Sequence, residues 1–340
     1  MGTGPSGSAD HRRIVPLDGW RGISISLVLA AHLLPLGPAR FQLNATAGPM
    51  GMSIFFTLSG YLITAFLLER PDVKTFLIRR FLRILPLAWG VLFVLQLLPF
   101  SRQAPDDFAA SLLFYQNLHY ASTTDYNSHF WSLCVEMQFY VGAAVIVGLG
   151  GRRALRVLPF IALAVSGLRI YLNQPVAVAT YGRIDEILAG ATLALALGGE
   201  IDERLLVPLR RISPAVFALF LLLTSSPLTG RLNGLRAWAG AMLVGSTLLQ
   251  QEHWLARPLR SRLLHYLATI SYALYVIHGP LRCGWFSEGN TVGRYLIRRP
   301  LTLLLSFALA HLSTFYWEAR WIELGRRLTR RRAPPAVVPG

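Results

Sequence analysis

Apolar runs of about 17 to 20 residues recur from one end of the chain to the other, separated by short polar segments. A helix that crosses a bilayer needs roughly 20 predominantly apolar residues, so each run is a candidate transmembrane helix. The pattern therefore predicts an all-α, polytopic membrane protein with about ten transmembrane helices. The expected spans are approximately residues 21–37, 50–68, 82–99, 131–149, 155–172, 181–198, 213–229, 234–250, 267–284 and 299–318.

Basic residues are unevenly distributed between the loops. About 23 of the 33 Lys and Arg residues lie near the two ends or in alternate loops, the distribution that marks the cytoplasmic side of an inner membrane. We therefore expect both termini in the cytoplasm. The main exception is the group of Arg294, Arg298 and Arg299, which precedes the last span on the opposite side.

The ends of the chain differ from its apolar body. Residues 1–15 are rich in Gly, Ser and Pro, which predicts a disordered cytoplasmic tail. Residues 16–325 form the predicted transmembrane domain, and residues 326–340 form a basic cytoplasmic tail.

Composition supports a membrane protein and argues against two other classes. Hydrophobic residues make up 53% of the chain and charged residues only 15%, against an average of about 25%. The net charge of +16 would suit a nucleic-acid partner, but the basic residues fall in short blocks between apolar runs, so we expect none. Cys134 and Cys283 are isolated in apolar runs, which predicts neither a disulfide framework nor a metal site.

Ionisable residues inside the expected spans are the candidates for chemistry, because each costs several kcal/mol alone in lipid. They are His32, Glu136, Arg183, Asp185 and His278. We expect them to share one interior and to satisfy one another. Such an interior holds a general base, an orienting carboxylate and a cation for a developing oxyanion. It could equally be a proton relay, so a proton-coupled transporter is the alternative to an enzyme.

Several of these residues also have structural explanations. Arg183 and Glu186 are spaced for a simple ion pair on a helix, and His278 could bond only a backbone carbonyl. Arg80 and Arg83 share a helix face where the cytoplasmic leaflet meets water. Their guanidinium groups could clamp the phosphates of a cosubstrate, or could simply anchor the helix.

Six short motifs, taken in order, resemble the acyltransferase-3 family of bacterial integral membrane acyltransferases over residues 16–325. They are Arg21 with His32, Ser53–Ile63, Arg80 with Arg83, Trp131-Ser132-Leu133 with Glu136 and Phe139-Tyr140, Arg183–Gly190, and Tyr275–His278. Two departures are Met137, where the family often has a second carboxylate, and Glu318-Ala319-Arg320, which lacks a common proline. The chain resembles the stand-alone type without a fused periplasmic esterase-like domain.

The resemblance implies a bacterial inner-membrane O-acyltransferase that uses acyl-CoA, with acetyl-CoA expected first. The acceptor would be a carbohydrate hydroxyl on an envelope glycan or a macrolide-type sugar. His32 would act as general base or acyl carrier, Glu136 would orient it or balance its charge, and Arg80 and Arg83 would hold coenzyme A phosphates. The residues expected to bind substrate or the oxyanion are Arg21, Trp131, Ser132, Tyr140, Arg183, Asp185 and His278.

Overall fold

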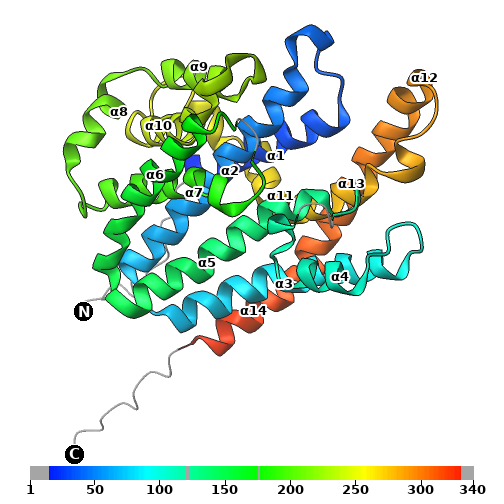
Figure 1. The fold of residues 1–340 in the computed structure, drawn as a ribbon, viewed down its shortest axis with the longest axis horizontal. Helices are drawn as coiled ribbons and strands as arrows, with labels where there is room; N and C mark the ends of the chain where they lie inside the picture. Colours follow the sequence, from blue (N-terminus) through cyan, green and yellow to red (C-terminus); the bar gives the residue numbers. More distant parts are fainter. Residues whose placement is uncertain (1–14, 120–122, 175–176, 331–340) are drawn as a thin grey trace, which may run out of the picture.

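Every regular element is helical in the part of the chain that the computed structural model describes, residues 15–119, 123–174 and 177–330 (Figure 1). The α-helices are α1 (Val15–Leu33), α2 (Leu43–Glu69), α3 (Val73–Leu97), α4 (Pro105–Leu112), α5 (Trp131–Gly150), α6 (Leu158–Tyr171), α7 (Asp185–Leu197), α8 (Val207–Arg211), α9 (Pro214–Ser225), α10 (Arg236–Leu249), α11 (Arg262–Leu281), α12 (Thr291–Gly293), α13 (Arg299–Leu312) and α14 (Ala319–Leu328). The all-α expectation is confirmed. The tails expected at 1–15 and 326–340 lie outside the described residues, apart from residue 15 and residues 326–330.

Several helices are long and apolar enough to cross a membrane, so this is a multi-pass membrane protein. Within the described residues, five helical segments meet that test on their own: Ala39–Glu69, Val73–Leu97, Ser128–Gly150, Arg152–Tyr171 and Thr291–Leu328. A sixth arises if Glu203–Arg211 and Pro214–Ser225, which are bent by 99°, are counted as one span.

Fewer membrane-length helices are present than the ten apolar runs suggested. The runs at 181–198, 213–229 and 234–250 contain α7, α9 and α10, which have 13, 12 and 14 residues. At 1.5 Å per residue these helices are roughly 20 Å long, shorter than the hydrocarbon core. The apolar runs continue into 3₁₀ turns and loops, which run length alone does not reveal.

The first helix is fixed by the stretch Leu17–Gly22. The indole nitrogen of Trp20 donates a hydrogen bond to the hydroxyl of Thr247 at 2.8 Å. A Cβ at Gly22 would lie 2.5 Å from the backbone carbonyl oxygen of Leu264, so only glycine allows this approach of α1 to α11. This contact sets how α1 lies against α11, and therefore which side chains of the two helices meet near their other ends.

We expect Gly22→Leu to destabilise the folded protein by about 1–3 kcal/mol, because the added side chain must push α1 away from the α11 backbone. The measurement is the melting temperature of the purified protein in detergent. Gly167→Leu on α6 is the matched control, because a Cβ at Gly167 meets open space. Equal melting temperatures for the two variants would contradict the close contact between α1 and α11.

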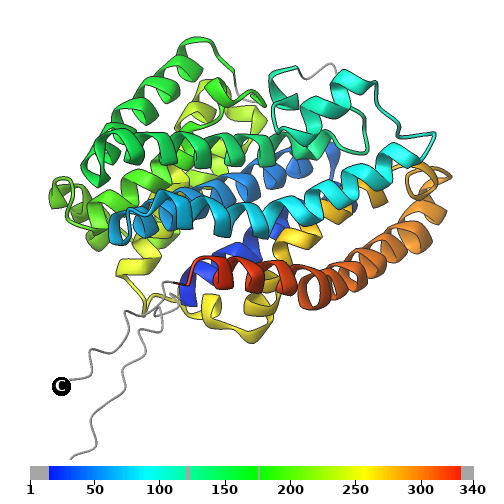
Figure 2. The same ribbon diagram turned by 90° about the horizontal axis from the view of Figure 1, so that it is seen from below.

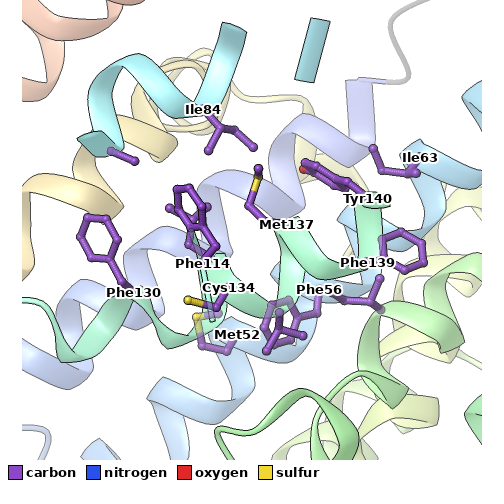
Figure 3. Packing of buried hydrophobic residues seen from close by; sticks show 14 of the residues in the cluster. Met52, Phe56, Ile63, Ile84, Phe114, Phe130, Cys134, Met137, Phe139 and Tyr140 are labelled. Atoms are coloured by element: carbon purple, nitrogen blue, oxygen red, sulfur yellow. The ribbon is translucent and has the colours of Figure 1, made fainter. Parts of the chain in front are cut away.

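Helix α2 lies at the centre of the molecule, where it packs against α1 and α7 (Figure 2). Gly60 of α2 lies against the backbone of Ile187, and Gly190 of α7 lies against that of Thr57, so closely that a Cβ on either glycine would collide with the other helix. Buried apolar side chains of α2, α3 and α5, such as Phe56, Ile84 and Met137, fill the space between these helices (Figure 3). This core holds α5 rigidly beside α2, and α5 carries much of the candidate site.

Candidate functional site

Two histidines from distant parts of the chain meet where α1 and α11 both end. The Nδ1 atom of His32 lies 3.0 Å from Nε2 of His278. Their rings are stacked, with centroids 5.2 Å apart and planes inclined by 15°. The sequence placed both residues in one interior, and the structure brings them into direct contact.

The hydrogen bonds around His278 assign the protons of both rings. Nδ1 of His278 lies 2.8 Å from the carbonyl oxygen of Tyr275 and 3.1 Å from that of Leu274. Carbonyl oxygens only accept, so this nitrogen carries the hydrogen and Nε2 of neutral His278 is an acceptor. Nδ1 of His32 therefore donates to it. Nε2 of His32 is left with a free lone pair, and no protein group in the described ranges hydrogen-bonds it.

A third histidine and two hydroxyls hold this pair in place. His129 donates from Nε2 to the carbonyl oxygen of Val276 at 3.1 Å, and its ring packs edge-on against His278. The hydroxyl of Tyr275 donates to the carbonyl oxygen of His129 at 2.5 Å. Since its proton is used there, this hydroxyl accepts from Ser132 at 2.5 Å. These contacts tie α11 to the start of α5.

His32 opens onto a cavity of about 280 Å³. Trp131, Arg183 and Arg282 also line this cavity. The guanidinium carbon of Arg183 lies 5.3 Å from the centre of the Trp131 ring, and its Nη2 lies 3.5 Å from the Glu186 carboxylate. Nε of Arg183 is buried, and no described group hydrogen-bonds it. The cavity thus combines an imidazole that has a free lone pair with a guanidinium group.

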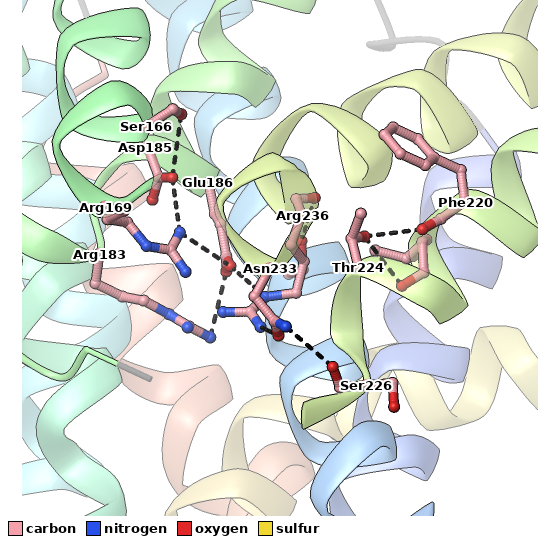
Figure 4. Close-up of polar contacts among 12 residues, drawn as sticks. Ser166, Arg169, Arg183, Asp185, Glu186, Phe220, Thr224, Ser226, Asn233 and Arg236 are labelled. Atoms are coloured by element: carbon pink, nitrogen blue, oxygen red, sulfur yellow. Dashed lines mark hydrogen bonds and ion pairs between the residues drawn. The ribbon is translucent and has the colours of Figure 1, made fainter. Parts of the chain in front are cut away.

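Arg183 belongs to a buried ion network that joins α6, α7 and α10 (Figure 4). Nη1 of Arg169 lies 2.7 Å from the Asp185 carboxylate, and Nε of Arg236 lies 2.8 Å from that of Glu186. The five side chains of the network are almost completely buried. The expected Arg183–Glu186 pair is present, but as part of this network rather than alone. Asp185 is held by Arg169 and by the hydroxyl of Ser166.

A second polar group lies further along α5. The Glu136 carboxylate accepts hydrogen bonds from the hydroxyls of Ser59 and Tyr140, each at 2.5 Å. The guanidinium carbon of Arg80 lies 5.9 Å from the centre of the Tyr140 ring. The charges of Arg21 and Arg83 also act within this group. We call Glu136 with Arg21, Arg80 and Arg83 the arginine–glutamate group.

Within the described residues no hydrogen bond joins Glu136 to His32, and a role of Glu136 in balancing the charge of His32 stays a prediction. His32 is oriented by His278, and Glu136 is engaged by Ser59 and Tyr140. The physical reason lies in helix spacing: Glu136 is one turn, or about 6 Å, further along α5 than Ser132, which adjoins the histidines. Tyr140 is about 6 Å further again, so α5 joins two separate polar groups.

Three contributors to the site were not singled out from the sequence. His129 precedes α5 and contacts both Tyr275 and His278. Arg169 and Arg236 complete the buried ion network. Both arginines fall within expected spans, and arginine at that depth is itself a signal of function or pairing. Within the described residues no cluster of His, Cys, Asp or Glu is arranged to hold a metal ion.

A family comparison matches almost the whole chain. The model of the acyltransferase domain matches residues 14–317. No solved structure matches the chain.

Bacterial proteins share this similarity. The chain is 28% identical to the provisionally named peptidoglycan O-acetyltransferase YrhL of Bacillus subtilis strain 168, over 95% of the chain and 57% of that protein. It is 28% identical to O-acetyltransferase OatA of Staphylococcus aureus strain NCTC 8325, over 62% of the chain and 40% of that protein. The chain thus spans little more than half the length of the first of these relatives and less than half of the second.

Proposed function

Since the chain belongs to the acyltransferase-3 family of membrane O-acyltransferases, we propose that it transfers an acetyl group from acetyl-CoA to a carbohydrate hydroxyl. The observation that carries this proposal is the free lone pair on Nε2 of His32, at the wall of a cavity that also holds Arg183. A base and an oxyanion-stabilising cation at one cavity are what acyl transfer requires.

The transfer would proceed with His32 as general base. Nε2 of His32 takes the proton of the acceptor hydroxyl as its oxygen attacks the thioester carbonyl carbon. Arg183 stabilises the resulting oxyanion with its guanidinium group. The carbon–sulfur bond then breaks, the ester remains on the acceptor, and the imidazolium returns its proton to the departing sulfur. His278 acts as a positioning residue, because it holds His32 in the tautomer that leaves Nε2 free.

The remaining site residues have supporting parts in this proposal. Trp131 packs against Arg183, Ser132 bonds the hydroxyl of Tyr275, and Asp185 neutralises Arg169. Asp185 is thereby a positioning residue for the network that holds Arg183.

The donor would be held by the arginine–glutamate group. Arg21, Arg80 and Arg83 lie near Glu136, while the charge of Asp18 also acts on Arg21 and that of Glu318 on Arg83. Guanidinium groups bind phosphate through paired hydrogen bonds. Tyr140 and Glu136 follow Ser132, which adjoins the histidines, along α5. A donor bound by Arg80 beside Tyr140 would therefore extend its thioester along this helix toward His32. Arg21 completes the phosphate contacts from α1.

The charges of the loops support a topology, and the name of one relative supports an acceptor class. The alternation of basic loops supports about ten crossings of a bacterial inner membrane, with both termini in the cytoplasm. Each short helix would cross the membrane together with the turns that flank it. The donor then enters from the cytoplasm and the acceptor from outside. One relative is named for peptidoglycan O-acetylation, which makes an envelope glycan a better first acceptor than a macrolide-type sugar.

The deciding experiment uses membranes that contain this protein, acetyl-CoA and a crude envelope glycan. We expect release of free thiol together with transfer of labelled acetyl to the glycan, above the level in membranes that lack the protein. A proton-coupled transporter would instead move a solute with no thiol release. Absence of both thiol release and glycan labelling, with acetyl and longer donors, would refute the proposal.

We expect Arg80→Gln and Arg83→Gln each to raise the KM for acetyl-CoA by about tenfold with little change in kcat, because each removes a charged contact made equally to ground and transition states. Thiol release at varied acetyl-CoA concentration is the measurement. Lys74→Gln, an exposed residue on the same helix, is the control and should leave KM unchanged. A fall in kcat with constant KM would show that these arginines do not serve donor binding.

A further inference from the structure

An apolar cleft lies between α3, α11 and the α13–α14 segment, separate from the cavity of His32. Its volume is about 1040 Å³, and Val91, Val94, Leu281, Leu309 and Trp317 are among its lining side chains. Val94 is 57% exposed and Leu309 43% exposed, so the cleft opens on the side of the molecule that faces the bilayer. Its apolar lining suits a hydrocarbon chain.

Three arginines without a carboxylate partner among the described residues lie where α11 ends and α13 begins. Arg282 and Arg294 each donate one weak hydrogen bond, to Ser128 and to the carbonyl oxygen of Gly289, both at 3.4 Å. The Nε atoms of Arg282, Arg294 and Arg299 are buried, and no described group hydrogen-bonds them. The salt bridges within the described residues involve other arginines. Glu288 is the acidic residue on the cleft lining, and it is exposed. Arginines at this end also break the charge pattern of the loops, so anchoring in the cytoplasmic leaflet does not explain them.

The arginines stand between the cleft and the cavity. Arg282 lines the cavity of His32, and the residues that follow it, Cys283 to Phe286, line the cleft. The charges of Arg282 and Arg299 act on His32, and those of Arg282 and Arg294 act on Arg299. The molecule thus presents, in order, a polar cavity with the catalytic base, the three arginines and an apolar cleft.

We propose that these three features bind a lipid-linked sugar: the sugar in the cavity of His32, the phosphate against Arg282, Arg294 and Arg299, and the hydrocarbon chain in the cleft. Sugar, phosphate and chain occur in that order in such a molecule, and guanidinium groups with free donors suit its phosphate. The inference rests on the proposed function, since it identifies the acceptor as a sugar still attached to its lipid carrier.

Binding is measurable without any donor, by native mass spectrometry of the full chain in detergent. The probes are a polyprenyl phosphate, the matching neutral polyprenol and phosphatidylglycerol. We expect the polyprenyl phosphate to bind at least about tenfold more tightly than the polyprenol, because hydrogen bonds to a charged group are worth roughly 1.5–3 kcal/mol. Equal binding of the two would overturn the role of the arginines. Equal binding of phosphatidylglycerol would replace the lipid-linked sugar with an ordinary phospholipid.

Two pairs of variants locate the ligand. Arg282→Gln combined with Arg299→Gln should weaken the polyprenyl phosphate by about tenfold or more, whereas Arg231→Gln, an exposed arginine on other elements, should not. Gly90 lines the cleft and a Cβ there meets open space, so Gly90→Phe should place its ring in part of the cleft. Gly142→Phe on α5 is its control, since that position is equally open.

Loss of binding in Gly90→Phe but not in Gly142→Phe would place the hydrocarbon chain in the cleft, and unchanged binding in Gly90→Phe would overturn that placement.

Failure of the lipid-binding proposal is distinguishable from failure of the proposed function. Acetyl transfer to a soluble glycan without lipid binding would refute only the lipid carrier. Lipid binding without any thiol release from acetyl-CoA would refute acyl transfer and leave the lipid site standing.

Discussion

Replacing His32 by alanine is expected to lower acetyl transfer by about 10²- to 10⁴-fold, the contribution of a positioned general base. The loss should appear in kcat, because the imidazole takes the proton only as the hydroxyl attacks the thioester. Thiol release and acetyl transfer by membranes carrying His32→Ala, compared with wild type at equal protein level, give the ratio.

The control for this prediction is His253→Ala, because His253 hydrogen-bonds Ser213 far from the cavity. A general base also predicts that the protein itself acquires no acetyl label when labelled acetyl-CoA is supplied without acceptor. Acetyl-histidine trapped at His32 would contradict the base mechanism in favour of an acyl carrier. Activity within twofold of wild type in His32→Ala would remove His32 from the chemistry altogether.

Replacing Glu186 by glutamine is expected to destabilise the folded protein by about 3–5 kcal/mol, which is a large part of the total stability of a typical protein. The Glu186 carboxylate is fully buried and lies 2.8 Å from Arg236, 3.5 Å from Arg183 and 3.9 Å from Arg169. Without its charge, three buried guanidinium groups would lose the carboxylate that lies within 4 Å of each of them. The thermal midpoint and the yield of monodisperse protein in detergent are the measurements.

Glu200→Gln is the matched control for the buried carboxylate. Glu200 pairs with Arg156 at 2.8 Å, but the Arg156 side chain is 51% exposed, so the pair contributes about 0–1 kcal/mol. The two variants remove the same charge and differ in burial. Equal thermal midpoints for Glu186→Gln and Glu200→Gln would show that the network does not hold the fold together.

The helical class and the main polar groups were predictable because each depends on local pattern. Apolar runs and their spacing predict helices directly, and charged residues within such runs mark an interior. His32, Arg183 and His278 were identified on that basis. In the structure His32 and Arg183 line one cavity, and His278 lies within hydrogen-bond distance of His32. The number of full-length helices was less predictable, because an apolar run does not show where a helix passes into a 3₁₀ turn.

The pairing of the polar residues was not predictable. Spacing within a helix determines which residues share a face, but the rotation of one helix against another depends on close contacts between distant segments. Here the approach of Gly22 to the backbone of Leu264 sets α1 against α11, and it brings His32 to His278 rather than to Glu136. A sequence lists the ionisable groups of an interior without showing how they divide into separate groups.

The histidine pair ends on the backbone carbonyls of Leu274 and Tyr275, which cannot take up a proton. In the proposed reaction a proton taken up by His32 is therefore not passed along the pair, and it leaves on the sulfur of coenzyme A. The hydroxyl proton thus leaves with coenzyme A as the acetyl group passes to the acceptor, so no net charge crosses the bilayer. Such a transfer is electroneutral, so its rate should follow the supply of donor and acceptor and not the membrane potential.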